Sequence, residues 1–143
     1  DVERSRGLGD VYKRQIDDYP MELVSPVDWT DESQNINDRV RSYLDVNCGH
    51  CHSPTGNANS TGLYLHLDET RDIHLGLYKK PVATGRGSGG LKYSIVPGKP
   101  DESILLHRMI SLDPGVMMPE SGRALSHTEA VEMVREWILV MED

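Results

Sequence analysis

Residues 47–52 read NCGHCH, and this short stretch holds both cysteines of the 143-residue chain. Two intervening residues place the thiols of Cys48 and Cys51 within one turn of the chain. Both thiols can therefore reach two reactive groups on a single edge of one flat molecule. The next residue, His52, then lies beneath the centre of that molecule, so the spacing predicts that these three side chains act as one chemical unit.

This C-x-x-C-H pattern is the attachment signature of c-type haem. Its two thiols add to the two vinyl groups of the porphyrin, and its histidine donates an imidazole nitrogen to the iron as the proximal ligand. The motif therefore predicts one covalently bound haem c, with thioethers at Cys48 and Cys51 and with His52 at the iron. His50, which lies between the cysteines, is expected to be exposed to solvent.

A methionine loop later in the chain offers a second ligand to the iron. Residues 117–119 read MMP, and a thioether in the sixth coordination position raises the reduction potential and suits electron transfer. The proline fixes its own backbone angle and stiffens the loop. We therefore select Met118, next to the proline, as the distal ligand. Met117 is the second choice and otherwise fills space in the core.

Three other interpretations of the two cysteines compete with haem attachment. The sequence CGHC occurs in thiol-disulfide oxidoreductases, but that activity needs alternating strands and helices around the motif. A zinc ion could take Cys48 and Cys51 together with His66 and His74, although their spacing is a poor match to structural zinc sites. A plain disulfide across two residues would close a very small loop and stabilise little.

Three segments have the apolar spacing of helices. The first leads directly into the cysteine motif, with Asn35 or Asn37 as its cap. The second begins at residues 100–102, which read PDE and supply proline and acids for a first turn. The last follows Ser126 and Glu129, which match the S-x-x-E capping box. The apolar faces are Ile36, Val40, Tyr43 and Leu44; Ile104, Leu105 and Met109; and Ala130, Val134, Trp137, Ile138 and Met141.

Two short segments between the cysteine motif and the methionine loop have the pattern of strands. Leucines alternate with other residues over 63–67, and residues 93–96 end at a Pro-Gly pair. We expect the two strands to pair, which predicts a mainly α fold with a small two-stranded β insertion. The glycine-rich segment 85–90 lacks the spacing of a phosphate loop and is expected to be flexible.

Several further side chains and segments are expected to surround the haem. The outer N–H of a proximal histidine normally needs an acceptor, which we expect within residues 54–62. Arg86, in the glycine-rich segment, is a hypothetical partner for a haem propionate. The apolar wall of the site is expected to consist of Leu44, Leu63, Ile104, Leu105 and Trp137.

Composition narrows the classes of partner. The net charge is −8, from 23 acidic and 15 basic residues, which argues against nucleic-acid binding because that depends on Lys and Arg at phosphates. An acidic surface suits redox partner proteins that present a basic docking patch. Hydrophobic residues make up 37% of the chain and Phe is absent, so a large apolar cofactor would supply missing buried surface. No stretch approaches the roughly 18 consecutive apolar residues of a membrane-spanning helix.

The beginning of the chain does not resemble natural sequence. Residues 10–15 read DVYKRQ, which GAT GTG TAT AAG AGA CAG encodes, and this DNA resembles a transposon end used in preparing sequencing libraries. We interpret residues 1–15 as a sequencing-adaptor artefact, 16–35 as an extended lead-in and 36–143 as the folded domain. A signal peptide would then be missing from this fragment.

The order of parts resembles the class I cytochrome c fold: a helix into C-x-x-C-H, an inserted segment, a helix, a Met-Pro loop and a last helix. Residues 95–105 read IVPGKPDESIL, and together with residues 108–109 and 117–120 they are similar to bacterial dihaem c-type cytochromes. The resemblance covers roughly residues 36–140. The chain has one C-x-x-C-H, so this motif can attach only one haem.

The resemblance implies thioethers at Cys48 and Cys51, His52 as proximal ligand, Met118 as distal ligand and export to the periplasm, where haem is attached. We therefore expect a periplasmic single-electron carrier and not an enzyme. The alternative is the electron-accepting haem domain of a larger oxidoreductase or a haem peroxidase, and the latter needs an open position at the iron. A thiol-disulfide oxidoreductase is the remote alternative.

Overall fold

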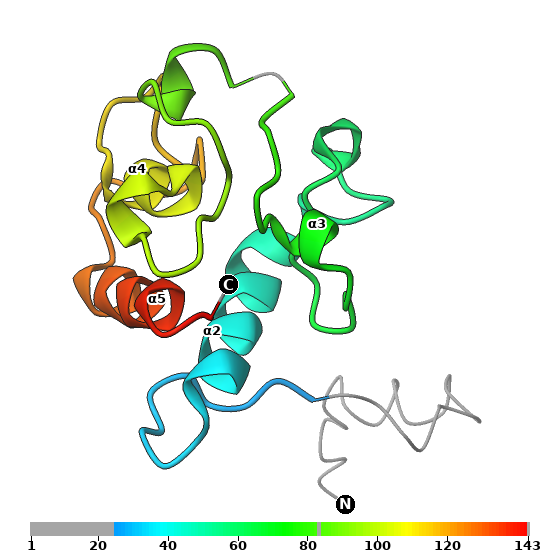
Figure 1. Ribbon diagram of the computed structural model, residues 1–143, viewed down its shortest axis with the longest axis vertical. Helices are drawn as coiled ribbons and strands as arrows, with labels where there is room; N and C mark the ends of the chain where they lie inside the picture. The colour runs from blue at the N-terminus through cyan, green and yellow to red at the C-terminus, as the bar shows by residue number, and fades with distance from the viewer. Residues whose placement is uncertain (1–24, 83, 143) are drawn as a thin grey trace, which may run out of the picture.

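A computed structural model describes residues 25–82 and 84–142. The interpretation of residues 1–15 as an artefact, and the first part of the lead-in, lie outside the described residues. The described part is mainly helical, as predicted, and its α-helices are joined by short 3₁₀ turns and loops (Figure 1). The α-helices are α2 (Ile36–Leu44), α3 (Asp72–Leu75), α4 (Ile104–Ile110) and α5 (Thr128–Leu139).

Helix α2 forms where the sequence predicts it and carries the cysteine motif at its end. The Asn35 side chain caps the helix by accepting a hydrogen bond of 2.8 Å from the Asn37 N–H. The predicted face is buried at Val40, Tyr43 and Leu44. Beyond Leu44 the chain continues as one turn of π-helix, Asp45–Gly49, so the first cysteine sits on a helical extension of α2.

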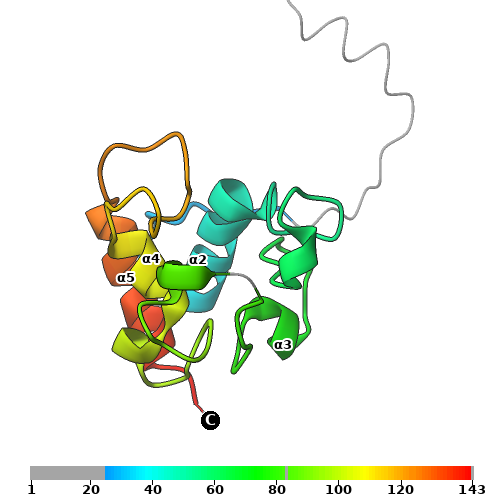
Figure 2. The same cartoon turned by 90° about the horizontal axis from the view of Figure 1, so that it is seen from above.

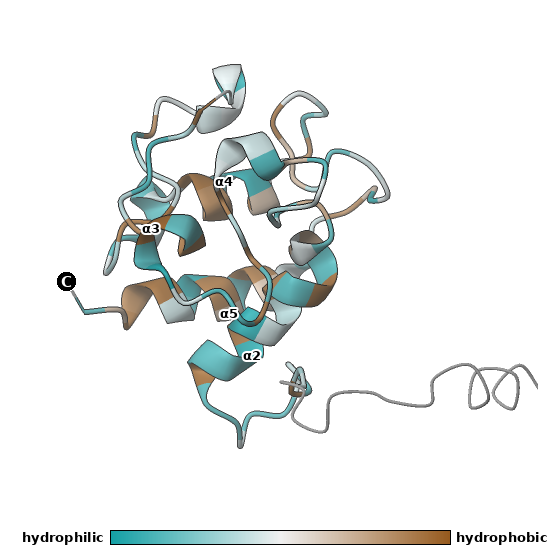
Figure 3. Cartoon of the chain, turned by 90° about the vertical axis from the view of Figure 1, so that its right-hand side faces the viewer, coloured by the Kyte–Doolittle hydropathy of each residue, from teal (hydrophilic) through white to brown (hydrophobic). Residues whose placement is uncertain are grey.

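Helix α5 packs on α2 and forms the centre of the core (Figures 1 and 2). Val40 and Leu44 of α2 and Val134 and Ile138 of α5 have no exposed surface, and burying each such side chain stabilises the fold by about 1.5–3 kcal/mol. Apolar residues on α4 and α5 are brown in Figure 3, whereas most of the connecting loops are polar. No helix of the described residues is long and apolar enough to cross a membrane.

Helix α4 begins later than its sequence signal suggests. Residues Pro100–Glu102 form a 3₁₀ turn, the chain is extended at Ser103, and α4 starts at Ile104. The buried hydroxyl of Ser103 accepts a hydrogen bond from the Val96 N–H at 2.9 Å and donates one to the Lys99 carbonyl at 3.0 Å. A serine that bonds to nearby backbone in this way competes with helix formation.

The predicted β insertion is wrong, because neither segment forms a strand in the described part of the chain. Within residues 63–67, the Tyr64 N–H donates to the His74 carbonyl while the Leu65 N–H donates to the His52 carbonyl. Two consecutive residues thus donate to two different segments, so residues 63–67 do not form a continuous ladder of hydrogen bonds with either one. Residues 93–96 do not pair with 63–67 either. Two isolated parallel bridges join Leu77 to Ile95 and Tyr93 to Ser103.

The predicted capping box at the start of α5 also does not form. His127 occupies the cap position and makes no capping hydrogen bond with its side chain. Ser126 instead donates from its hydroxyl to the Met109 carbonyl at 3.2 Å. This bond ties the start of α5 to the end of α4, which brings together the two ends of the methionine loop.

Part of the lead-in packs against the domain. The Trp29 ring meets the rings of Tyr43 and His127 edge-on, with centroids 5.6 and 5.1 Å away. The Tyr43 hydroxyl is hydrogen-bonded to Nδ1 of His127 at 3.1 Å. Trp29 of the lead-in therefore packs against α2 and against the residue that precedes α5.

Candidate cofactor site

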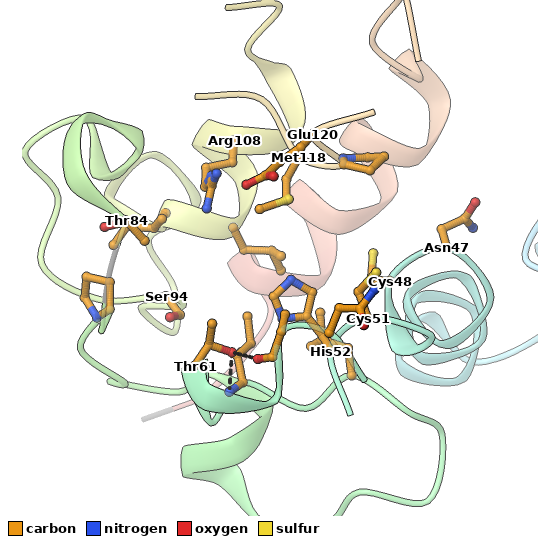
Figure 4. A pocket seen from close by; sticks show the side chains of 18 of the residues that line it. Asn47, Cys48, Cys51, His52, Thr61, Thr84, Ser94, Arg108, Met118 and Glu120 are labelled. Carbon is orange, nitrogen blue, oxygen red and sulfur yellow. Dashed lines mark hydrogen bonds between the residues drawn. The ribbon is translucent and has the colours of Figure 1, made fainter. Parts of the chain in front are cut away.

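A cavity of about 480 Å³ lies between the cysteine turn and the methionine loop, within the range of about 300–1,000 Å³ that is usual for small-molecule and cofactor sites. Cys48, Cys51 and His52 line one side, and Met118 lines the other (Figure 4). The structure thus brings all four predicted site residues to one cavity. Met117, the second choice for the distal ligand, is not among the lining residues.

The cysteine turn is held by its own backbone. The N–H groups of Cys51 and His52 both donate to the Cys48 carbonyl, at 3.1 and 2.8 Å. This winding continues the helix by one more turn and places the two thiols beside each other, next to the His52 ring (Figure 4). Both cysteines are free and partly exposed, so both can react with a group that enters the cavity. His50 is exposed, as predicted.

A tight turn after the motif supports this arrangement. The Ala58 N–H donates to the Cys51 carbonyl at 3.0 Å, and the Gly56 N–H donates to the Ser53 carbonyl at 3.1 Å. Gly56 lies directly against the motif, because a Cβ atom there would come 2.3 Å from the Cys51 carbonyl oxygen. The loop can close on the cysteine turn in this way only with a residue that has no side chain.

The electrostatic environment of Cys48 opposes thiolate chemistry. Burial, with a smaller contribution from the neighbouring Cys51, raises the pKa of its thiol to about 12. Reactive cysteines of oxidoreductases have a lowered pKa instead. No three His, Cys, Asp or Glu side chains among the described residues are grouped to hold a metal ion, so the geometry does not support the alternative zinc site with His66 and His74.

The His52 imidazole has the properties of a neutral ligand. Burial lowers its pKa most, the Leu63 backbone raises it, and the positive charge of Arg108 lowers it. The neutral ring is the form that binds metals. Its Nδ1 atom is buried and makes no hydrogen bond of normal geometry among the described residues, so the Leu63 backbone interacts with the ring only weakly. None of residues 54–62, where we expected the acceptor, takes this role.

The methionine side of the cavity is built on α4. The Met118 N–H donates to the Arg108 carbonyl at 3.0 Å, and Nε of Arg108 donates to the Val116 carbonyl at 2.8 Å. The Met118 and Arg108 side chains lie across the cavity from His52, with Glu120 next to them (Figure 4). The thioether therefore faces the imidazole from the opposite wall.

The apolar wall was predicted in part. Leu63, Ile104 and Leu105 line the cavity, and so does Leu65, which the sequence did not single out for the wall. Leu44 and Trp137 are not lining residues; they belong to the buried core. The sequence could not separate these groups, because apolar residues at the regular spacing of a predicted helix or strand can face either the core or the cavity.

The arginine at the cavity is not the predicted one. Arg86 pairs with Asp113 at 3.0 Å on the surface and does not line the cavity, whereas Arg108 and Lys79 do. The segment around Arg86 is a 3₁₀ turn, Gly85–Ser88. The sequence did contain a signal for Arg108. Ile104 was predicted to line the site, and Arg108 follows Ile104 by four residues, so both side chains lie on the same face of α4.

No family model, no curated protein and no solved structure matches this chain. The function must therefore be inferred from the chemistry of the site itself: two thiols, an imidazole and a thioether around one largely apolar cavity.

Proposed function

We propose that this chain is a single-electron carrier that holds one covalently attached haem c, with His52 and Met118 as the axial ligands of the iron. One observation carries this proposal: Cys48, Cys51, His52 and Met118 converge on a single cavity of about 480 Å³. The motif and the methionine are far apart in the sequence, and only the packing of α2, α4 and α5 brings them together.

The residues present fit a haem. The two thiols are free, adjacent and open to the cavity; imidazole and thioether are the axial pair that gives haem iron a high potential suited to electron transfer. When bound, haem c supplies a one-electron iron couple. The chain's own residues would attach it, fill both axial positions and exclude water with leucine and isoleucine side chains. Water exclusion favours the less charged reduced state and so raises the potential further.

No residue of the site has to act as an acid or a base in this function. With both axial positions filled, a substrate or peroxide finds no open position at the iron, which is why we favour a carrier over a haem peroxidase or other enzyme. The acidic chain, with a net charge of −8, suits redox partner proteins with a basic docking patch. In the bacterial cytochromes that the chain resembles, haem is attached to this motif in the periplasm, so we propose the same location for this protein.

The site supports the remote alternative, a thiol-disulfide oxidoreductase, much less well. Burial raises the pKa of Cys48 to about 12, which leaves almost no thiolate at neutral pH. The described residues contain no strand, so the cysteine motif there lacks the strand–motif–helix setting of such enzymes.

The proposal is tested by producing the chain together with haem-attachment machinery and recording its absorption spectra in the oxidised and reduced states. We expect covalent haem and the weak long-wavelength band of iron–thioether bonding in the oxidised form. Met118→Ala should abolish this band, and the matched control Met117→Ala should keep it. Covalent haem with a high-spin spectrum would indicate an open coordination position at the iron and would favour a haem enzyme. Absence of haem would favour the thiol-disulfide oxidoreductase.

A further inference from the structure

Arg108 of α4 contacts the methionine loop with both its backbone and its side chain. Its carbonyl accepts the hydrogen bond from the Met118 N–H at 3.0 Å. Its Nε donates to the Val116 carbonyl at 2.8 Å. The two bonds hold the loop on either side of Met117, so a single residue of α4 sets the position of the backbone from which the Met118 side chain extends.

Arg108 itself is fixed from two directions. A Cβ on Gly87 would lie only 3.3 Å from the Arg108 guanidinium carbon, so the guanidinium rests on the bare backbone of that glycine. Arg123 donates from Nη1 to the Met109 carbonyl at 2.6 Å and from Nη2 to the Arg108 carbonyl at 3.3 Å. These carbonyls lie in the last turn of α4, where carbonyl groups lack partners within the helix.

The other bonds of the segment that precedes Met118 do not anchor it firmly. The N–H groups of Val116 and Met117 both donate to the Asp113 carbonyl, which curls the loop without tying it to the domain. The ion pair between Arg86 and Asp113 joins two exposed side chains, and such pairs contribute little because solvent screens them. The bonds of Arg108 are therefore the main restraint on the segment before the thioether, while Arg123 ties the segment after it to the Arg108, Met109 and Ser111 carbonyls.

We propose that Arg108 is a positioning residue that holds the Met118 thioether over the cavity through its hydrogen bond to the Val116 carbonyl. This inference rests on the proposed function, in which Met118 is the distal ligand. Loss of the side-chain bond leaves the Met118 N–H bonded but frees the preceding turn, so the closed position of the loop becomes less populated. The thioether then competes less well with any other ligand for the same position.

The test compares Arg108→Gln and Arg108→Lys with the unaltered haem-loaded chain, with Arg135→Gln as the control. Arg135 is a partly buried arginine that bonds to Asp101 on the exposed side of α5. Two quantities are measured: the affinity of the iron for added imidazole, and the midpoint pH at which the iron–thioether band disappears as the pH is raised. Loss of one hydrogen bond changes an equilibrium constant by up to about tenfold, so we expect imidazole to bind up to about tenfold more tightly and the pH midpoint to fall by up to about one unit.

The lysine variant separates positioning from charge. It keeps the positive charge in the cavity but loses the planar guanidinium that reaches Val116, so we expect it to behave like the glutamine variant. If Arg108→Lys has the same imidazole affinity and pH midpoint as the unaltered chain, the role of Arg108 is purely electrostatic and the proposal is overturned. If the glutamine variant fails to fold, Gly87→Ala, which displaces the guanidinium without removing it, should shift both quantities in the same direction by less.

The outcomes also distinguish this inference from the proposed function. An unaltered chain without haem, or without the thioether band, would overturn both. An unaltered chain with the band, whose Arg108 variants match the Arg135→Gln control in imidazole affinity and pH midpoint, would overturn the role of Arg108 alone.

Discussion

Replacing Gly56 with alanine should destabilise the chain much more than a glycine-to-alanine change usually does. An added Cβ would lie 2.3 Å from the Cys51 carbonyl oxygen, 2.7 Å from its carbon and 2.8 Å from the His50 carbonyl oxygen. All three are backbone atoms of the cysteine turn, which cannot swing aside as a flexible side chain can. Gly56 does not have a positive φ, so the expected cost is steric and not conformational.

The magnitude follows from what must move. Forcing an extra methyl group into a filled site costs about 1–3 kcal/mol. Moving the Cys51 carbonyl also breaks its 3.0 Å hydrogen bond from the Ala58 N–H, which contributes about 0.5–1.5 kcal/mol. We therefore expect the free energy of unfolding to fall by about 2–4 kcal/mol, and the melting temperature by roughly 10 °C.

Urea and thermal unfolding of the purified variant measure this change, and Gly98→Ala is the matched control. Gly98 has a φ of +69° and nothing within 4 Å of an added Cβ, so alanine there meets only conformational strain of about 1 kcal/mol. The yield of covalent haem should also fall for Gly56→Ala, because the clash lies at Cys51. A cost at Gly56 no larger than at Gly98 would refute the steric reasoning.

Two further predictions concern stability. Hydrogen bonds from Arg71 hold the pKa of Glu69 at about 2, below its ordinary value, so the stability that this carboxylate contributes is present at neutral pH and is lost as the pH falls from about 5 towards 2. Glu69→Gln should flatten the pH dependence of the unfolding free energy in that window, and an unchanged slope would contradict this. Leu44→Ala, at a fully buried position, should lower the unfolding free energy by about 2–5 kcal/mol, whereas Val46→Ala at a 64% exposed position should change it by less than about 0.5 kcal/mol; equal effects in urea unfolding would contradict the placement of α2 in the core.

The sequence predicted the elements whose signals are local. The spacing of Val40, Tyr43 and Leu44 and the cap at Asn35 are set within one helix, and α2 forms with these residues in those roles. The same holds for the buried face of α5. Alternating leucines misled the strand prediction, because only Leu65 of the segment is buried, and the N–H groups of Tyr64 and Leu65 donate to two different segments, so no ladder forms.

The part of the candidate site that lies within one sequence motif could be predicted. The part that depends on contacts between residues far apart in the sequence could not. Cys48, Cys51 and His52 lie within five residues and reach one cavity together. The place of Met118 depends on a bond to Arg108, on a different element, and no local pattern reports that bond. The glycines around Arg86 directed attention to the wrong arginine for the same reason.

The packing of α5 on α2 has a consequence for the time at which the thiols are accessible. Val40 and Leu44, which have no exposed surface in the folded chain, stay open to water until α5 has docked on α2. A chain that reaches the haem-attachment compartment unfolded therefore passes through an interval in which Cys48 and Cys51 are carried next to a core that has not yet closed. A bulky group meets the least obstruction at the two thiols during that interval.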